Sequence, residues 1–167
     1  MYQEYNLPYN SPFIGLFLFA PDYIKMLENL KEYLNKELIF IERDQSQYTL
    51  YVNSSYPIGL LNDVEIHFLH YKSNDEAKRK WNKRVQRINF DNMIIKFCDR
   101  DLCIPELIQK FDLLPYPNKV CFTAKLYPQL KSVIVLKALL GQEMVSEEWK
   151  HSKSHYNFRK EANRITH

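Results

Sequence analysis

The fold prediction starts from the stretch Val64-Glu-Ile-His-Phe-Leu-His-Tyr71 and from Ser73-Asn-Asp-Glu76, which follows it closely. Residues 64–71 combine β-branched and aromatic residues with partial alternation, a pattern that predicts a buried strand. Ser73 and Glu76 have the spacing of a capping box, so a helix is expected from there to about Ile88. Its apolar stripe would be Ala77, Trp81, Val85 and Ile88. A strand that leads directly into a helix is typical of α/β folds.

Similar patterns extend in both directions along the chain. Further strands are expected at residues 14–19, 38–41, 47–52, 93–98, 119–123 and 133–136, and further helices at 22–34 and 105–111. Tyr56-Pro-Ile-Gly59 is expected to be a turn. Because strands alternate with helices, we expect an α/β fold, a three-layer α/β/α arrangement with a mainly parallel sheet of about five or six strands.

The domain organisation follows from length and polarity. A chain of 167 residues fits one domain comfortably. Residues 1–140 are therefore expected to form a single α/β domain. Residues 141–167 are a polar C-terminal extension, expected to be helical and to pack on the same domain.

Composition excludes some classes of protein. The chain has only three glycines, at positions 15, 59 and 141. A phosphate-binding loop of the dinucleotide or P-loop type needs closely spaced glycines, so neither class is expected. Aromatic residues make up 14% of the chain. That share fits either a well-filled core or a surface on which sugars or bases stack, and composition does not choose between them.

Neither a membrane span nor a signal peptide is expected. The longest apolar run, Ile14 to Ala20, is much shorter than the roughly 20 residues of a spanning helix. The N-terminus lacks a basic start followed by a long apolar stretch. The three cysteines, an odd number, fit free thiols in a reducing compartment, which predicts a cytoplasmic location.

Several strings of residues resemble a known family. They are Tyr9-Asn-Ser-Pro-Phe-Ile-Gly-Leu-Phe17, Tyr56-Pro-Ile-Gly59, Ile66-His-Phe-Leu-His-Tyr71, Lys80-Trp-Asn-Lys-Arg84, Arg87-Ile-Asn-Phe-Asp-Asn92 and Leu114-Pro-Tyr-Pro-Asn-Lys-Val-Cys-Phe-Thr123. The chain resembles an uncharacterised bacterial family, a domain of unknown function, linked by name to exopolysaccharide biosynthesis. The resemblance implies an α/β fold and the company of polysaccharide-assembly proteins, without established catalytic residues. It also implies a member shortened at its N-terminus.

Two carboxylates at the end of an expected strand could bind a metal. Asp99-Arg100-Asp101 follows the apolar run 93–98. An Asp-x-Asp turn of this kind resembles the metal-binding turn of many nucleotide-sugar glycosyltransferases, where two carboxylates hold Mg²⁺ or Mn²⁺. The alternative is ordinary turn chemistry, because Asp is common at strand ends.

The histidines of the central strand are a second candidate. His67 and His70 should point to opposite faces of a strand, so a shared metal is not expected. His70 and Tyr71 would lie at the carboxyl end of the strand, where ligands of parallel sheets bind. Either could act as a general base or as a hydrogen-bonding group for a sugar or phosphate. The alternative is a structural role for each.

The expected helix after this strand is strongly basic. Between Lys72 and Arg87 there are seven basic residues against two acidic ones, in a chain of net charge +3. Arg79, Lys83 and Arg84 are therefore candidates for binding the diphosphate of a nucleotide sugar, or an anionic lipid surface. Binding to nucleic acid is not expected, because no recognisable nucleic-acid module accompanies the charge. The alternative is a solvated helix face.

These observations lead to two functional hypotheses. The first is a cytoplasmic protein of surface or exopolysaccharide biosynthesis, a metal-dependent glycosyl- or other group transferase acting on a nucleotide-sugar-like donor. The second is a non-catalytic binding or assembly subunit that docks on a partner enzyme or on an anionic membrane surface. Binding of nucleotide sugar with Mn²⁺ would favour the first, and salt-sensitive lipid binding the second.

Overall fold

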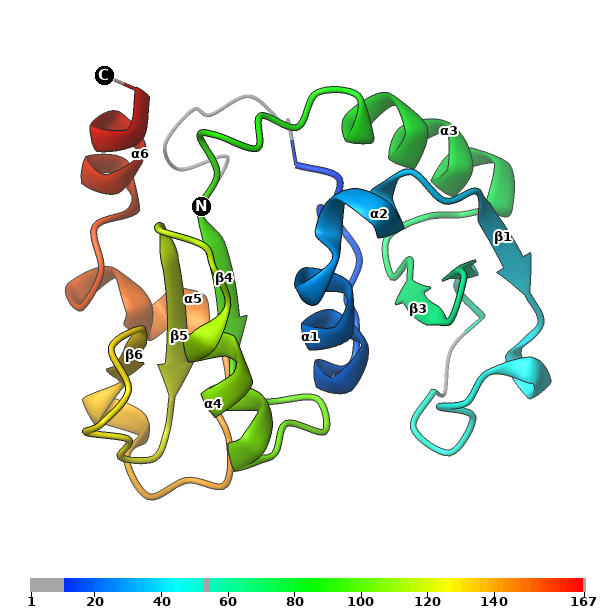
Figure 1. Ribbon diagram of the computed structural model, residues 1–167. Coiled ribbons are helices and arrows are strands. Elements are labelled where there is room, and N and C mark those ends of the chain that lie inside the picture. Colours follow the sequence, from blue (N-terminus) through cyan, green and yellow to red (C-terminus); the bar gives the residue numbers. More distant parts are fainter. Residues whose placement is uncertain (1–10, 53–54, 167) are drawn as a thin grey trace. The chain divides into compact units, whose positions relative to one another are not determined.

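The computed structural model describes residues 11–52 and 55–166 (Figure 1). The chain divides into two compact units. Of the described residues, 11–52 and 55–88 form the N-terminal unit and 89–166 form the C-terminal unit. Each unit has its own three-stranded sheet.

The N-terminal unit is built on an antiparallel sheet of order β1-β2-β3. Its elements are α1 (Ala20–Glu28), α2 (Leu30–Leu34), β1 (Leu38–Ile41), the 3₁₀ turn η1 (Arg43–Gln45), β2 (Ile58–Leu61), β3 (Val64–His67) and α3 (Asn74–Val85). β2 and β3 are joined by only two residues, Asn62 and Asp63. Asn62 has a φ of 56°, a left-handed conformation that Asn tolerates better than most residues, and a tight hairpin follows.

Helices α1 and α3 supply apolar side chains to the core of this unit. Helix α1 begins with Pro21 near its N-terminus and packs against β3. Helix α3 buries Trp81, whose ring meets Phe68 edge-on with centroids 6.2 Å apart. At the N-terminus of α3, Ser73 accepts the backbone N–H of Glu76, as the capping box predicts. The Glu76 carboxylate bonds the N–H of Lys72, one residue earlier than that motif requires.

The C-terminal unit is built on a parallel sheet of order β4-β5-β6. Its elements are β4 (Ile95–Cys98), α4 (Pro105–Leu113), β5 (Lys119–Thr123), β6 (Val133–Val135), the 3₁₀ turns η2 (Lys137–Leu139) and η3 (Ser152–Ser154), α5 (Glu148–His151) and α6 (Phe158–Thr166). Phe111 of α4 packs on Phe97 of β4, with ring centroids 5.2 Å apart. Phe122 of β5 belongs to a separate buried cluster with Val145 and Phe158. Residues beyond 140 thus contribute to the core of this unit.

The predicted fold class is wrong. The chain does not form a three-layer α/β/α sandwich with five or six mainly parallel strands, because its strands form one antiparallel and one parallel sheet of three strands each. The main error was to interpret residues 56–59 as a turn, when Ile58–Leu61 is β2 and the turn is Asn62-Asp63. Strands β2 and β3 are connected by two residues and therefore pair antiparallel. Parallel strands need a much longer connection. The division into one domain at 1–140 and an extension at 141–167 stays a prediction.

Some predicted elements differ in the details. Residues 14–19 do not form a strand, and within them only Phe17 pairs with a strand residue, in an antiparallel bridge to His67. Residues 47–52 form turns. The strand predicted at 64–71 ends at His67, so His70 and Tyr71 lie in the connection to α3. The strands predicted near 38–41, 93–98, 119–123 and 133–136 are confirmed.

Candidate functional site

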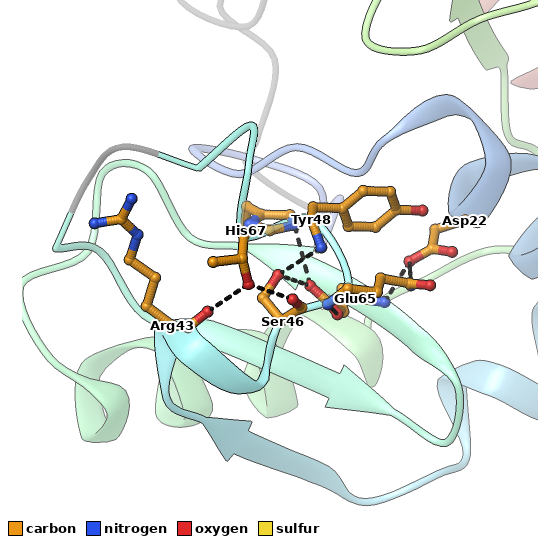
Figure 2. A network of polar contacts seen from close by, with 8 residues as sticks. Asp22, Arg43, Ser46, Tyr48, Glu65 and His67 are labelled. Atoms are coloured by element: carbon orange, nitrogen blue, oxygen red, sulfur yellow. Dashed lines mark hydrogen bonds and ion pairs between the residues drawn. The ribbon is translucent and has the colours of Figure 1, made fainter.

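A cluster of buried polar side chains covers one face of β3. Glu65 and His67 are two residues apart in this strand, so they point to the same side of the sheet. Helix α1 contributes Asp22, and the segment after η1 contributes Ser46 and Tyr48. We call these five residues the buried polar cluster (Figure 2). Each is at least nine-tenths buried, which is unusual for charged side chains.

Hydrogen bonds satisfy the two carboxylates of the cluster. Glu65 accepts the hydroxyl of Ser46 at 2.6 Å and the backbone N–H of Gln47 at 2.7 Å, one on each oxygen. Asp22 accepts the backbone N–H of Glu65 at 2.7 Å and the side-chain amide of Gln47 at 3.0 Å. The two acids are therefore linked through Gln47 and the backbone of β3. These bonds fasten α1 and the segment after η1 to the sheet.

Burial changes the acidity of the groups around Asp22. Burial raises the pKa of Asp22, although the N–H of Glu65 acts in the opposite direction. The hydroxyl of Tyr48 is close to this carboxylate, and burial together with the nearby negative charge raises the pKa of Tyr48. The phenol is therefore protonated at neutral pH and can donate a hydrogen bond.

His67 differs from the rest of the cluster because its ring has no hydrogen bond. The side chain is completely buried, and neither Nδ1 nor Nε2 has a partner within the described part of the chain. Nε2 lies 3.6 Å from a carboxylate oxygen of Glu65, which is too long for a hydrogen bond. Burial lowers the pKa of His67 to about 4. The imidazole is thus neutral at pH 7, and its contact with Glu65 is not an ion pair.

Aromatic rings surround the imidazole. Phe17 stacks on it with centroids 4.8 Å apart, and Phe19 meets it edge-on at 5.2 Å. Tyr48 and Tyr56 also meet it edge-on, at 6.0 and 5.9 Å. We call this arrangement of Phe17, Phe19, Tyr48 and Tyr56 the aromatic chamber of His67. It keeps water from the imidazole, which explains the lowered pKa.

An open cavity lies next to this chamber. It measures about 790 Å³ and is lined by Ile41, Glu42, Arg43, Ser55, Tyr56, Pro57, Ile58, Lys72, Ser73 and Asn74. We call it the Arg43–Lys72 pocket. Its walls are the end of β1, the start of β2 and the first residues of α3. Tyr56 belongs both to this pocket and to the aromatic chamber.

The pocket has the features of a site for an anion. Arg43 and Lys72 supply positive charge, and Ser73 and Asn74 are the N-cap and first residue of α3. The first N–H groups of a helix have no acceptor within the helix, and the helix dipole favours negative charge at this end. Among the described residues of the lining Glu42 is the one acid, and its side chain already accepts the backbone N–H of Gln45. In Figure 2 the guanidinium of Arg43 points away from the carboxylates of the buried polar cluster.

The residues predicted at the end of the strand have different surroundings. His70 is exposed. Tyr71 is buried, and its hydroxyl donates to the carbonyl of Ile14 at 2.6 Å and accepts from Arg84 at 2.5 Å. Arg84 also donates to Ile14. Tyr71 and Arg84 therefore attach the segment around Ile14 to α3, a structural use of both side chains.

The predicted phosphate-binding residues do not lie in the pocket. Arg79 and Lys83 are exposed and four residues apart, so they share the outer face of α3. Neither lines the Arg43–Lys72 pocket. On the same helix Lys80 pairs with Glu76 at 2.7 Å, and Lys78 pairs with Glu37 at 3.1 Å. Arg79 and Lys83 thus form a separate basic stripe on the N-terminal unit.

The predicted metal ligands belong to the C-terminal unit. Asp99 is buried, and its two oxygens accept the backbone N–H groups of Ala124 at 2.7 Å and Val145 at 2.8 Å. Burial raises the pKa of Asp99, opposed by these two bonds. Asp101 has a φ of 56° and pairs with Arg100 at 2.9 Å. Each carboxylate thus has its own protein donors. Within residues 11–52 and 55–166 no group of three or more His, Cys, Asp or Glu could hold a metal ion.

Sequence reasoning missed Arg43 and Lys72 as a pair. Lys72 was noticed only as part of the basic run, and Arg43 follows a short strand in a segment with no motif. The two residues lie 29 positions apart in the sequence. Both line the same cavity, because the end of β1 and the start of α3 border it. No local pattern in the sequence signals such a meeting.

Comparison with known proteins identifies the family. The family model of a domain of unknown function, DUF1919, matches residues 1–166, and the chain belongs to this family. It is 41% identical over 144 residues to an uncharacterized protein of Haemophilus influenzae (strain ATCC 51907 / DSM 11121 / KW20 / Rd). The match covers 86% of this chain and 66% of that relative, so the chain spans a little under two thirds of the relative's length. In the described part of the chain, no helix is both long and apolar enough to cross a membrane.

Proposed function

We propose that the protein binds a phosphate-bearing carbohydrate, such as a nucleotide sugar, in the Arg43–Lys72 pocket, and that it acts in surface or exopolysaccharide biosynthesis in the cytoplasm. The observation that carries the proposal is the convergence of Arg43, Lys72 and the N-terminus of α3 on one cavity. A guanidinium, an ammonium and helix N–H groups are the donors that proteins use for phosphate. The polysaccharide pathway comes from the family resemblance of the sequence.

The pocket can be tested with two anionic probes. Isothermal titration calorimetry with inorganic pyrophosphate and with UDP-glucose should show binding to the unmodified protein. The double variant Arg43→Gln with Lys72→Gln should weaken binding of both probes by about tenfold or more, because two charge-assisted contacts are lost. Affinity should also fall as salt is added.

The basic stripe on α3 provides a matched control. Arg79→Gln with Lys83→Gln removes the same charge from the N-terminal unit without touching the pocket lining. Pyrophosphate should bind this variant with an affinity within about twofold of that of the unmodified protein. The small loss reflects the weaker long-range attraction once two distant positive charges are removed. If the two double variants weaken binding equally, general positive charge and not the pocket is responsible. No binding of either probe to the unmodified protein would refute the proposal.

A second function, docking on an anionic membrane surface, is favoured by one observation. Arg79 and Lys83 lie on the outer face of α3, four residues apart. Sedimentation with phosphatidylglycerol vesicles tests this function. Here the roles of the two double variants are reversed: loss of Arg79 and Lys83 should reduce sedimentation, and loss of Arg43 and Lys72 should not.

Metal dependence and group transfer are separate proposals. Mn²⁺ alone is titrated into the unmodified protein and into Asp101→Asn, which leaves the buried bonds of Asp99 in place. Binding of Mn²⁺ that Asp101→Asn abolishes would support the metal hypothesis. Release of UDP over time, followed by chromatography, would support turnover.

A further inference from the structure

His67 carries an unusual energetic cost for a residue in a core. A buried polar group that has lost its water and found no hydrogen bond destabilises the folded protein. His67 is 0% exposed, and its two ring nitrogens have no partner among the described residues. A neutral imidazole offers one donor and one acceptor, so two hydrogen-bonding positions are unused. Packing alone would be served better by a Phe at this position.

The imidazole lies directly behind a wall of the Arg43–Lys72 pocket. Ile58 is paired with His67 across the β2–β3 ladder, so the two side chains are neighbours on the same face of the sheet. Tyr56, two residues earlier, meets the imidazole edge-on at 5.9 Å. Ile58 and Tyr56 both line the pocket. Their side chains separate the pocket from His67 at this wall, and Tyr56 is the less buried of the two.

We propose that the aromatic chamber of His67 is a ligand-induced subsite for the sugar ring of the bound carbohydrate, which enters by displacing the ring of Tyr56. This inference rests on the proposed function, because the phosphate of the same ligand is held by Arg43 and Lys72. The ring of Tyr56 lies against the imidazole with centroids 5.9 Å apart, so its displacement exposes the imidazole to the pocket. A pyranose is thicker than a flat phenol ring, and it would occupy this space together with part of the adjoining cavity.

The chamber offers the two kinds of contact that a sugar needs. The C–H faces of a pyranose pack on aromatic rings, and Phe17 and Phe19 lie beside the imidazole. Sugar hydroxyls both donate and accept, which matches the two unused ring nitrogens of His67. Each oxygen of Glu65 accepts a hydrogen bond, from Ser46 or from Gln47, and has a second lone pair. A single hydroxyl could thus reach Nε2 and Glu65, whose atoms are 3.6 Å apart.

The test compares two probes that share a phosphate and differ in the sugar. Inorganic phosphate and hexose 1-phosphates (glucose, galactose and N-acetylglucosamine) are titrated into the full chain. At least one hexose phosphate should bind about tenfold tighter than phosphate, because it adds hydrogen bonds to groups that are otherwise unpaired. The ¹⁵N resonances of the His67 ring should shift with that hexose phosphate and should not shift with phosphate.

Two variants locate the effect. His67→Phe keeps an aromatic ring and removes both nitrogens, so the preference for the hexose phosphate should disappear while the affinity for phosphate is kept. Tyr56→Ala removes the ring that must be displaced, so the hexose phosphate should bind more tightly than to the unmodified protein. In Tyr56→Ala the pKa of His67, measured by NMR titration, should rise from about 4 toward 6.5 as water reaches the ring. Unchanged phosphate affinity reports that each variant is folded.

The outcomes separate this inference from the proposed function. Phosphate binding without a preference for any hexose phosphate would refute the subsite and leave the anion pocket intact. A preference that survives in His67→Phe would also refute it, since the imidazole would then make no contact with the sugar. Absence of binding of both probes would refute the pocket and, with it, the subsite.

Discussion

Asp99 and His67 are two deeply buried ionisable side chains, one in each unit, and they differ in whether the fold gives them partners. Asp99 accepts two backbone N–H groups, from residues 25 and 46 positions away. His67 sits among aromatic rings with both nitrogens unpaired in the described structure. A buried polar group whose bonds are complete stabilises the scaffold, whereas one that is left incomplete calls for an explanation, and the proposed sugar subsite supplies one for His67. The sequence drew attention to Asp99, because Asp99 has a motif, and left metal binding and ordinary turn chemistry open for it.

The strongest test of this contrast is the removal of the Asp99 carboxylate. Asp99→Ala leaves the N–H groups of Ala124 and Val145 without an acceptor. The free energy of unfolding should fall by roughly 2–5 kcal/mol, measured by urea denaturation. Asp101→Asn loses only a partly exposed pair with Arg100 and should change it by about 0.5 kcal/mol or less. Equal effects of the two substitutions would contradict a structural role for Asp99 alone.

The pH dependence of stability tests the burial of His67. The imidazole has a pKa of about 4 in the folded protein against an ordinary value of 6.5, so below pH 6.5 the unfolded chain binds a proton that the fold excludes. The contribution of His67 to stability is therefore fully present above pH 6.5 and is lost as the pH falls toward 4. The loss from this residue reaches about 3 kcal/mol at most.

His67→Phe is the control for that pH profile. Urea denaturation of both proteins between pH 7.5 and 4.5 isolates the contribution of His67 as a difference, because Asp22 and the other acids titrate in both. Parallel profiles would show that the imidazole is not excluded from water.

Substitution of Glu65 measures how much the hydrogen bonds of the buried polar cluster contribute to stability. In Glu65→Gln one carboxylate oxygen becomes an NH₂ group. Facing Gln47 it opposes an N–H donor, and facing Ser46 it forces the hydroxyl to give up its bond to residue 65 and to accept instead. We expect a loss of about 2 kcal/mol in the free energy of unfolding. Asp63→Asn changes an exposed carboxylate that pairs with Lys25, and should cost about 0.5 kcal/mol or less.

The smallest expected effect is the most informative about His67. At pH 7.5, His67→Phe should leave the free energy of unfolding unchanged or raise it by about 1 kcal/mol, because an unpaired polar group is replaced by an apolar one of similar shape. Thermal unfolding by circular dichroism measures the difference. A clear loss of stability would mean that the imidazole has bonds in the folded protein, and the comparison with Asp99 would then fail.

Local patterns predicted the elements better than their arrangement. The strand at Lys119–Thr123 and the helix that begins at Pro105 were found from short apolar runs and a proline, which depend on adjacent residues. The hairpin was missed, although Asn62-Asp63 between two apolar runs is a recognisable turn signal. Interpreting Pro57 and Gly59 as a turn hid the first strand of that hairpin.

The candidate site could be predicted only in part. The basic run directed attention to α3, but to Arg79 in its middle and to Lys83 and Arg84 in its last turn, and not to Lys72, which precedes the N-cap. Arg43 could not be found, because it reaches the pocket from another element. His67 was recognised as a strand residue, yet nothing in its neighbours indicates that its nitrogens are unpaired.

The amino-acid sequence by itself determined where some elements begin, such as α3 after Ser73, α4 at Pro105 and β5 at Lys119, because side-chain periodicity and capping act over a few residues. Only the tertiary structure decided the direction of strand pairing, the hydrogen bonds that both oxygens of Asp99 accept, and the lack of hydrogen bonds from the His67 ring to the described residues. Those properties depend on groups that are distant in the chain, such as Val145 for Asp99, and Phe17 and Tyr48 for His67. Whether a buried polar atom finds a hydrogen bond is a property of the whole packed unit, and no local pattern encodes it.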